Sequence, residues 1–383
     1  MRRMVAMSDP LEHLRSWSLD RQRLSRPGDD PLAVLNDVIG VYATQPAGPL
    51  ALRARVPGFD YRTIRRLEAE RQVIRVGGMR GTGHLVPMGS SALVTAATAR
   101  PMAGEAWRLC DAGIDRPMYE RLRDAILAAT DEPRSTRDLR AVVGARIALA
   151  PVIQTMGLEG VLVPIAPDSP RSAALLHVST EAWLGGLRPT VDPGIAVRWL
   201  VDEYLRAFGP ARVEDIRWWI GGRDAAVNDA VAALDLIALD GGALLRRADL
   251  PSFEARRPVT RGRIDVLAMW DAYTMGYRVD GRARFVSADM QSRLFDTDGN
   301  GLGAVLVDGL AAAAWVARTV GLRLDVDLDP FERPSRRLDA GIRDAFEDVA
   351  RVLELRQVSI RMAEGPLGRR VRRRRPGPVH VAD

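Results

Sequence analysis

Tyr42, Thr44 and Gln45 place three hydrogen-bonding side chains close together within the largely apolar residues 37–59. A phenol, a hydroxyl and an amide can each hold a substrate atom or a water molecule by hydrogen bonds. All 55 basic residues are arginine. Without lysine no side chain can form a Schiff base, and a P-loop is also excluded. Apart from the N-terminal amine, water is therefore the nucleophile expected at this site.

Metal and cofactor chemistry are not expected from the sequence. Cys110 is the single cysteine, so it can form no disulfide within the chain and no cysteine metal cluster. The histidines show no spacing that is typical of a metal site. They are His13, His84, His177 and His380.

A weak internal repeat indicates the elements that position these residues. Residues 138–144 and 215–221 are similar and both end in glycine, and residues 51–58 resemble them more loosely. Leu139 lies 87 residues after Leu52, and Ile216 lies 77 residues after Leu139. This spacing predicts three modules of about 80 residues.

Each module carries signals for helices followed by a β-hairpin. In the first, Asp30 and Pro31 begin a helix, residues 50–56 form a second and Asp60 caps a third. Three helices followed by a hairpin are typical of a winged helix. The expected hairpins are 73–76 with 82–86, 160–165 with 173–178, and one around 240–242. Other expected helices are one after a capping box at 135–138, then 147–156, 193–208, 215–220 and 225–234.

The predicted fold class is α+β and mainly α, with three tandem winged-helix modules followed by a small β-rich C-terminal domain. In that domain, residues 304–307, 322–328 and 357–362 are expected to be strands and residues 335–355 a helix. The expected boundaries are an N-terminal extension at 1–29, winged helices at 30–100, 101–185 and 186–255, the β-rich domain at 256–368 and a basic disordered tail at 369–383.

The chain resembles the AlkZ-like winged-helix DNA glycosylases over roughly residues 30–362. Residues 40–46 are similar to the family's G-L-Q-A-Q-D-P segment, and Arg80 to His84 resemble its R-G-T-x-H wing. The Trp218-Trp219 pair and residues 270–278 match two further family segments. This resemblance implies a concave surface, built from winged helices and a β-domain, that holds double-stranded DNA.

The same resemblance marks where base-excision chemistry would occur. The two glutamines of the family segment hold the attacking water, and Tyr42 and Thr44 stand in their places. Neither side chain replaces an amide well, since Tyr42 is rigid and Thr44 is short. Gln45 is one position out of register. Asp271 matches a family aspartate that stabilises positive charge on the sugar, or else satisfies a domain junction.

These observations lead to one function hypothesis and two alternatives. The first is a DNA-binding protein, acting on duplexes that are possibly alkylated or crosslinked, whose glycosylase activity is lost or much reduced. The second is an active monofunctional glycosylase using Tyr42, Thr44 or Gln45 with Asp271. The third is a winged-helix transcriptional regulator. The first wing offers Arg75, Arg80 and His84 as DNA contacts.

Most of the net positive charge lies at the end of the chain. Residues 369–383 hold six arginines and one aspartate, so they carry +5 of the net charge of +6. Such a tail is expected to bind DNA phosphates without reading sequence. No apolar stretch is long enough to cross a membrane. A monomer in the cytoplasm, associated with the nucleoid, is therefore expected. The tail arginines are Arg369, Arg370, Arg372, Arg373, Arg374 and Arg375.

Overall fold

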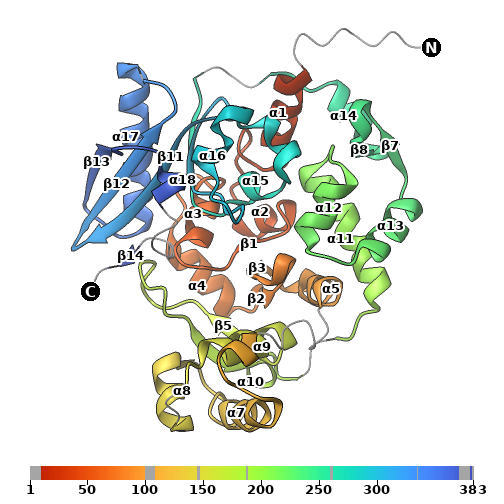
Figure 1. Ribbon diagram of the computed structural model, residues 1–383, viewed down its shortest axis with the longest axis vertical. Helices are drawn as coiled ribbons and strands as arrows, with labels where there is room; N and C mark the ends of the chain where they lie inside the picture. The colour runs from red at the N-terminus through yellow and green to blue at the C-terminus, as the bar shows by residue number, and fades with distance from the viewer. Residues whose placement is uncertain are drawn as a thin grey trace.

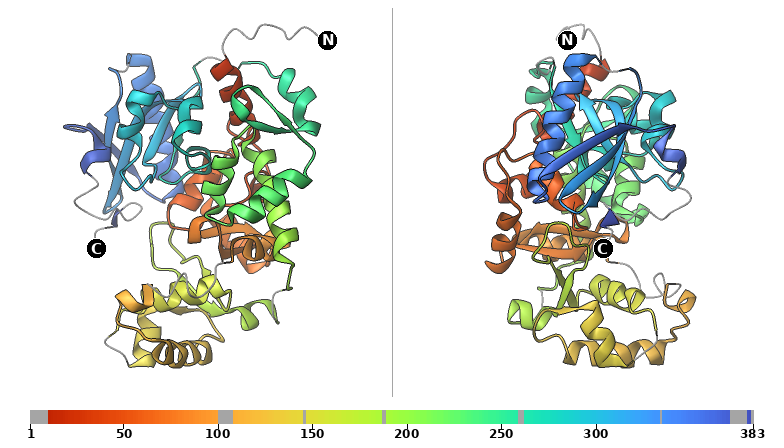
Figure 2. Two further views of the ribbon diagram at one scale, coloured as in Figure 1. Left: turned by 45° about the vertical axis from the view of Figure 1, so that its right-hand side comes forward. Right: turned by 90° about the vertical axis from the view of Figure 1, so that its left-hand side faces the viewer.

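The computed structural model describes residues 10–99, 108–144, 147–186, 189–258, 262–333, 335–370 and 380–381. Its architecture is mixed, with many helices, three small sheets and one larger sheet. Figures 1 and 2 show the larger sheet on one side of the molecule and the small unit that contains α7–α10 at one end. The fold class expected from the sequence, α+β, is confirmed at this level.

The first unit surrounds residues 42–45. Asp30 caps α2 by accepting hydrogen bonds from the backbone N–H groups of Leu32 and Ala33, and Asp60 caps α4. The short strand β1 pairs antiparallel with β3, which also pairs with β2. The elements are α2 (Pro31–Asp37), β1 (Val41–Tyr42), α3 (Ala47–Arg53), α4 (Tyr61–Ala69), β2 (Val73–Gly77), η1 (Met79–Gly81) and β3 (Gly83–Pro87).

The second unit repeats this order. Ser135 and Asp138 form the expected capping box at the start of α8, and Gly144 ends that helix in the left-handed conformation. Strand β6 pairs with both β4 and β5. The elements are α7 (Arg116–Ala128), β4 (Arg134–Ser135), α8 (Thr136–Val143), α9 (Ala150–Glu159), β5 (Leu162–Ile165) and β6 (Leu176–Ser179).

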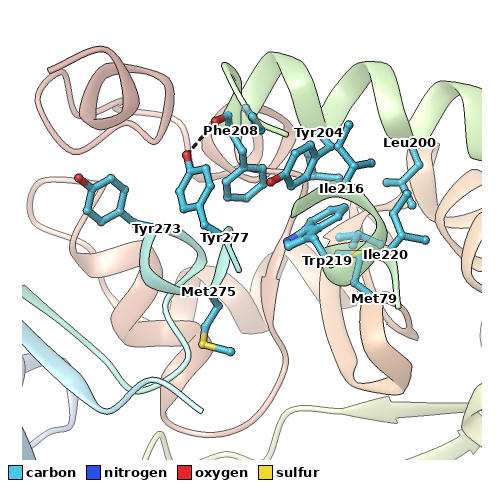
Figure 3. Packing of buried hydrophobic residues seen from close by; sticks show 14 of the residues in the cluster. Met79, Leu200, Tyr204, Phe208, Ile216, Trp219, Ile220, Tyr273, Met275 and Tyr277 are labelled. Atoms are coloured by element: carbon cyan, nitrogen blue, oxygen red, sulfur yellow. Dashed lines mark hydrogen bonds between the residues drawn. The ribbon is translucent and has the colours of Figure 1, made fainter. Parts of the chain in front are cut away.

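The third unit has a longer first helix and a smaller hairpin. Asp192 caps α11, and an isolated bridge from Ala211 to Leu244 takes the place of a first strand. Tyr204, Phe208 and Trp219 pack as a ring cluster with centroids 5.0–5.4 Å apart, as Figure 3 shows. The elements are α11 (Pro193–Phe208), α12 (Val213–Ile220), α13 (Asp224–Ala233), β7 (Leu236–Ala238), η2 (Asp240–Gly242) and β8 (Leu244–Arg246).

The larger sheet forms the C-terminal part of the described chain. Its strand order is β13-β12-β11-β10-β9, and β14 pairs with β11. Helix α17 packs against β9 and β13 and also contacts α3 of the first unit. The elements are β9 (Ile264–Leu267), β10 (Gly303–Val307), β11 (Leu310–Val320), β12 (Arg323–Pro330), α17 (Arg336–Val352), β13 (Gln357–Met362) and β14 (His380–Val381).

Shorter elements connect these parts. Tyr277 donates a hydrogen bond to the carbonyl of Phe208 (2.8 Å), which joins the segment after α15 to α11 (Figure 3). The elements are α1 (Pro10–Arg21), α5 (Met88–Thr98), α10 (Thr180–Leu184), η3 (Arg247–Asp249), α14 (Leu250–Glu254), α15 (Ala272–Met275), η4 (Val279–Arg284), η5 (Ala288–Met290), α16 (Gln291–Leu294) and α18 (Leu367–Arg370).

Several elements differ from the sequence expectations. The helix expected at residues 147–156 begins three residues later, with Pro151 in its first turn, where a missing N–H costs nothing. Residues 1–29, expected as an extension, contain α1, whose Trp17 is buried and donates to the carbonyl of Gly209 (2.8 Å). The alanine-rich strand β11 was not expected at all. Among the residues described, no helix has the length and apolar character needed to cross a membrane.

Candidate functional site

Tyr42 lies at the end of β1, where the structure joins it to the first wing. Its hydroxyl accepts a hydrogen bond from Nη2 of Arg80. Its ring lies 4.8 Å from the ring of His84, its partner across the strands, and stacks on Trp270 with centroids 6.0 Å apart. The phenol is therefore held at the meeting point of the first wing and the segment that follows β9.

Two residues whose side chains contact Tyr42 have a strained backbone. Arg80 has φ +56° and Trp270 has φ +59°, both in the left-handed region that such side chains rarely adopt. Both side chains contact Tyr42. Backbone strain of this kind persists where surrounding structure enforces it, and it clusters at functional sites.

Arg80 also connects Tyr42 to the third unit. Its guanidinium carbon lies 4.3 Å from the ring centroid of Trp218 on α12, and Arg282 lies 5.8 Å from the same ring. Cation–π contacts at these distances are favourable. The sequence predicts both Trp218 and Trp219 as core residues. Trp219 is buried in the core, whereas Trp218 is half-buried and faces the arginines.

Thr44 and Gln45 leave one polar atom each without a partner among the described residues. These atoms are Oγ1 of Thr44 and Oε1 of Gln45, and both are buried. The other amide atom of Gln45, Nε2, donates to the hydroxyl of Tyr61 (3.0 Å). That hydroxyl in turn donates to the carbonyl of Pro167 (2.7 Å), and burial raises the pKa of Tyr61 to about 12. Gln45 is 2% exposed, so its amide belongs to a buried chain of hydrogen bonds that reaches the second unit.

Asp271 is held in a buried ion pair with Arg55. The two carboxylate oxygens accept hydrogen bonds of 2.7 and 2.8 Å from the two Nη atoms, and both side chains are fully buried. One of these oxygens also accepts from the backbone N–H of Tyr273 and so caps α15. Arg55 donates further to the carbonyls of Gln22 and Ala51. This arrangement fits the junction role that the sequence left open for Asp271.

Two of the predicted DNA contacts are buried. Arg75 is 1% exposed and pairs with Glu68 at 2.6 Å, so its charge is already neutralised inside the first unit. His84 is 4% exposed, and burial is the main cause that lowers its pKa to about 4. At neutral pH its ring is uncharged. Arg80 is the half-buried member of the predicted trio, and it points at Tyr42 and Trp218.

The tail arginines cannot be placed in this site. Arg369 and Arg370 fall at the end of α18, and nothing is described of their side chains. Arg372, Arg373, Arg374 and Arg375 lie outside the described residues. Disorder is expected for residues 369–383, yet residues 380–381 form the short strand β14, which pairs with Arg318 and Thr319.

The site contains residues that sequence reasoning missed. Tyr61, Arg55 and Arg282 all contact or support the predicted residues, although none was predicted as a site residue. Trp270 was not predicted as a site residue, although it begins the segment 270–278 that resembles the family and directly precedes Asp271. The contacts of Arg282 depend on tertiary structure alone. Among the described residues, no group of three or more histidine, cysteine or acidic side chains could hold a metal ion.

The 42–45 segment can therefore hold polar groups in place but offers little for acid or base catalysis. The acidic residue predicted for it, Asp271, is paired with Arg55, and the hydroxyl of Tyr42 accepts one hydrogen bond from Arg80. A hydroxyl has one proton and two lone pairs, so Tyr42 can still bind a water molecule, but only in the orientation that its packed ring and Arg80 allow.

Comparisons with known proteins place this arrangement in a family. The model of the family described as DNA glycosylase AlkZ-like matches residues 35–352. Among solved structures, the Streptomyces sahachiroi DNA glycosylase AlkZ is similar, with a TM-score of 0.71 and 19% sequence identity, covering 93% of this chain and 100% of that chain. No curated protein matches the chain. Because the family match spans most of its length, from α2 to α17, the chain belongs to the AlkZ-like DNA glycosylase family.

Proposed function

We propose that this chain is a DNA-binding protein of the AlkZ-like family in which base excision is lost or much reduced. The ligand that it binds would be double-stranded DNA, including alkylated or crosslinked duplexes. Family membership supports DNA as the partner, and the contacts of Tyr42, with a short hydroxyl at Thr44 in place of an amide, support the loss of catalysis. We further propose that the chain acts as a monomer at the nucleoid.

The observation that carries this proposal is the hydrogen bond between Arg80 and Tyr42. In the family segment a glutamine at this position supplies an amide that can bind water. Here the phenol accepts from Arg80 and its ring packs on His84 and Trp270, so its orientation is set by protein contacts. Removing one preorganised polar group from an active site typically costs roughly 100- to 1,000-fold in rate. Replacing two should leave little of the activity.

Gln45 does not compensate in this proposal. Its Nε2 is committed to Tyr61, and its side chain is buried rather than directed to a surface where a sugar carbon could approach. A base alkylated on a ring nitrogen leaves readily, so what an enzyme must add is a positioned water. The chain retains the framework for holding DNA but lacks the paired amides for that step.

Three winged-helix modules would provide the DNA-binding framework. The supporting observation is that one order of elements occurs three times: a first helix, a strand or bridge, two helices and a hairpin. In each unit the strand or bridge pairs with the second strand of the hairpin. Arg80, at the tip of the first wing, is the DNA contact that this proposal favours.

A test of the proposal separates binding from chemistry. The full chain is titrated into a fluorescent duplex that carries one ring-nitrogen-alkylated purine, and anisotropy reports binding while heat-labile abasic sites report base release. We expect saturable binding with base release no faster than the uncatalysed rate. Saturable binding with rapid base release would contradict the loss of catalysis, and an absence of binding would contradict the proposed function as a whole.

An active monofunctional glycosylase is the second candidate, and one observation favours it. Oγ1 of Thr44 is buried without a partner among the described residues, so this hydroxyl remains able to bind a water molecule. Such an enzyme would form abasic sites without cutting the strand, because the chain contains no lysine for imine chemistry. Strand cleavage at the abasic site would therefore contradict this candidate.

A further inference from the structure

Arg282 is a buried cation without an ion-pair partner in the part of the chain that is described. It lies in η4, is 4% exposed and has no carboxylate oxygen within 4.0 Å among the described residues. Its hydrogen bonds are long, with Nε donating to the carbonyl of Tyr277 (3.3 Å) and Nη2 to that of Gly299 (3.5 Å). Buried charges in proteins are normally paired, so an unpaired one calls for an explanation.

The surroundings of Arg282 stabilise its charge only in part. Its guanidinium carbon lies 3.5 Å from the ring centroid of Phe295 and 5.8 Å from that of Trp218. These rings and the two carbonyls offer partial negative charge but no net charge. Arg80, a second cation, contacts the same Trp218 ring. Burial, and then the charge of Arg80, lower the pKa of Arg282 to about 10, and the negative charge of Asp215 opposes them to a smaller extent.

Arg282 also lines a cavity of about 410 Å³ that opens to solvent. The cavity lies between α16, the turn that follows it and α18. Phe295 and Gly368 also line the cavity. The other polar residues of the lining are Gln291, Ser292, Asp296 and Thr297. Ser292 and Thr297 are exposed, so their hydroxyls are accessible as hydrogen-bond donors at the rim.

The one acidic residue in this lining is already engaged. Asp296 accepts hydrogen bonds from the backbone N–H of Asp298 (3.0 Å) and of Asn300 (2.8 Å), and from Nδ2 of Asn300 (3.0 Å). Its carboxylate therefore organises the turn around residues 296–300 and is not paired with Arg282. The cavity consequently combines a guanidinium that has no ion-pair partner among the described residues with the hydroxyls of Ser292 and Thr297.

We propose that this cavity is a phosphate-binding site in which Arg282 is the central ligand. A guanidinium binds a phosphate group through two parallel charge-assisted hydrogen bonds, and the hydroxyls of Ser292 and Thr297 supply further donors. The phosphate belongs either to a free phosphate compound or to the backbone of bound DNA. The site goes beyond the proposed DNA-binding function, because it requires only the cavity and its own donors.

The test is a titration of inorganic phosphate into the full chain by isothermal calorimetry, at constant ionic strength maintained with sodium chloride. Saturable binding is expected, and Arg282→Gln should weaken it by roughly tenfold to a hundredfold, the usual worth of a hydrogen bond to a charged group. Arg278→Gln is the matched control, since Arg278 is exposed, lies four residues away and does not line the cavity. This control should retain wild-type affinity.

A second variant keeps the proposal testable if Arg282→Gln does not fold. Thr297→Val keeps the size of a rim residue and removes one donor, so it should weaken phosphate binding severalfold while leaving the fold intact. Two results would overturn the proposal. One is a wild-type titration with phosphate that gives no saturable heat beyond that of the same titration with sodium chloride. The other is a folded Arg282→Gln variant that binds phosphate with wild-type affinity.

Competition identifies the source of the phosphate. Displacement of a labelled duplex by inorganic phosphate at constant ionic strength would assign the site to a DNA phosphodiester. Phosphate binding without displacement would assign it to a free phosphate compound. A chain that binds phosphate but no DNA would contradict the proposed function and leave this site in place, so the two failures are distinguishable.

Discussion

Arg80 donates a hydrogen bond from Nη2 to the hydroxyl of Tyr42, and through it the tip of the first wing is tied to the segment where base-excision chemistry would occur. The same guanidinium packs on Trp218 of α12. One arginine therefore links the first and third units at the point where the family carries a water-binding amide. The proposed loss of catalysis follows from this relationship.

Restoring the two amides should restore chemistry. The double variant Tyr42→Gln/Thr44→Gln places amides at both positions, and we expect base release from an alkylated duplex to rise at least tenfold above wild type, since each positioned group is worth roughly 100-fold or more in other enzymes. Single-turnover base release measures this. The control is Tyr42→Phe/Thr44→Val, which removes the same hydroxyls without adding amides and should show no rise.

The buried pair between Arg55 and Asp271 should dominate the stability of its junction. Arg55→Met leaves the carboxylate of Asp271 buried and unpaired, so we expect the free energy of unfolding to fall by about 3–5 kcal/mol. Urea denaturation measures it. Arg116→Met is the control, because the pair of Arg116 with Glu120 is exposed and its loss should leave the midpoint unchanged. If Arg55→Met lowers the free energy of unfolding no more than Arg116→Met does, the structural role of the Arg55–Asp271 pair is contradicted.

Two buried histidines should make the fold sensitive to acid. Burial lowers the pKa of both His84 and His177 from the ordinary 6.5 to about 4. Between these values the unfolded chain binds more protons than the native one, so stability is full above pH 6.5 and falls as the pH drops toward 4. Each histidine contributes up to about 3 kcal/mol to this loss. Urea denaturation at a series of pH values measures this dependence of the free energy of unfolding on pH. His84→Gln should remove about half of it. The same pH dependence in the variant as in wild type would contradict the role of His84.

The arginine tail should account for much of the salt dependence of DNA binding. If all six tail arginines neutralise phosphates, deletion of residues 369–383 should flatten the slope of log K against log salt concentration by roughly five. Anisotropy titrations at several salt concentrations measure the slope. The same slope in the truncated chain would mean that the tail does not take part in binding.

Much of the helical framework could be predicted from the sequence because its signals are local. Asp30, Asp60, Ser135 and Asp192 all cap the helices that they were expected to cap. Capping depends on the hydrogen bonds of one residue to the next turn, so a short segment contains the information. The hairpins at β5–β6 and β7–β8 were likewise predicted, from their glycines and apolar runs.

Strand β11 shows where local reasoning fails. Its first residues, Leu310 to Ala314, include four consecutive alanines, which favour a helix in isolation. Pairing with β10 on one side and β12 on the other makes the segment a central strand, and these partners depend on the tertiary fold. Propensity is a weak signal when packing decides the outcome.

The candidate site divides in the same way. The positions of Tyr42 and Thr44 follow from the order of residues along the chain, whereas their partners come from distant segments. Arg80 lies 38 residues from Tyr42 along the sequence, and Asp271 lies 216 residues from Arg55. The burial of Arg75 could not be predicted from its position in the wing either. Its ion-pair partner, Glu68, lies outside the wing, on α4.

The most direct test of the account is the rate of base release in a single turnover, with wild-type protein and Thr44→Ala each in excess over a duplex that carries one ring-nitrogen-alkylated purine. We predict that both proteins bind the duplex and that base release by wild type stays near the uncatalysed rate and is unchanged by the substitution. Rapid base release by wild type that Thr44→Ala abolishes, with DNA binding intact, would contradict it.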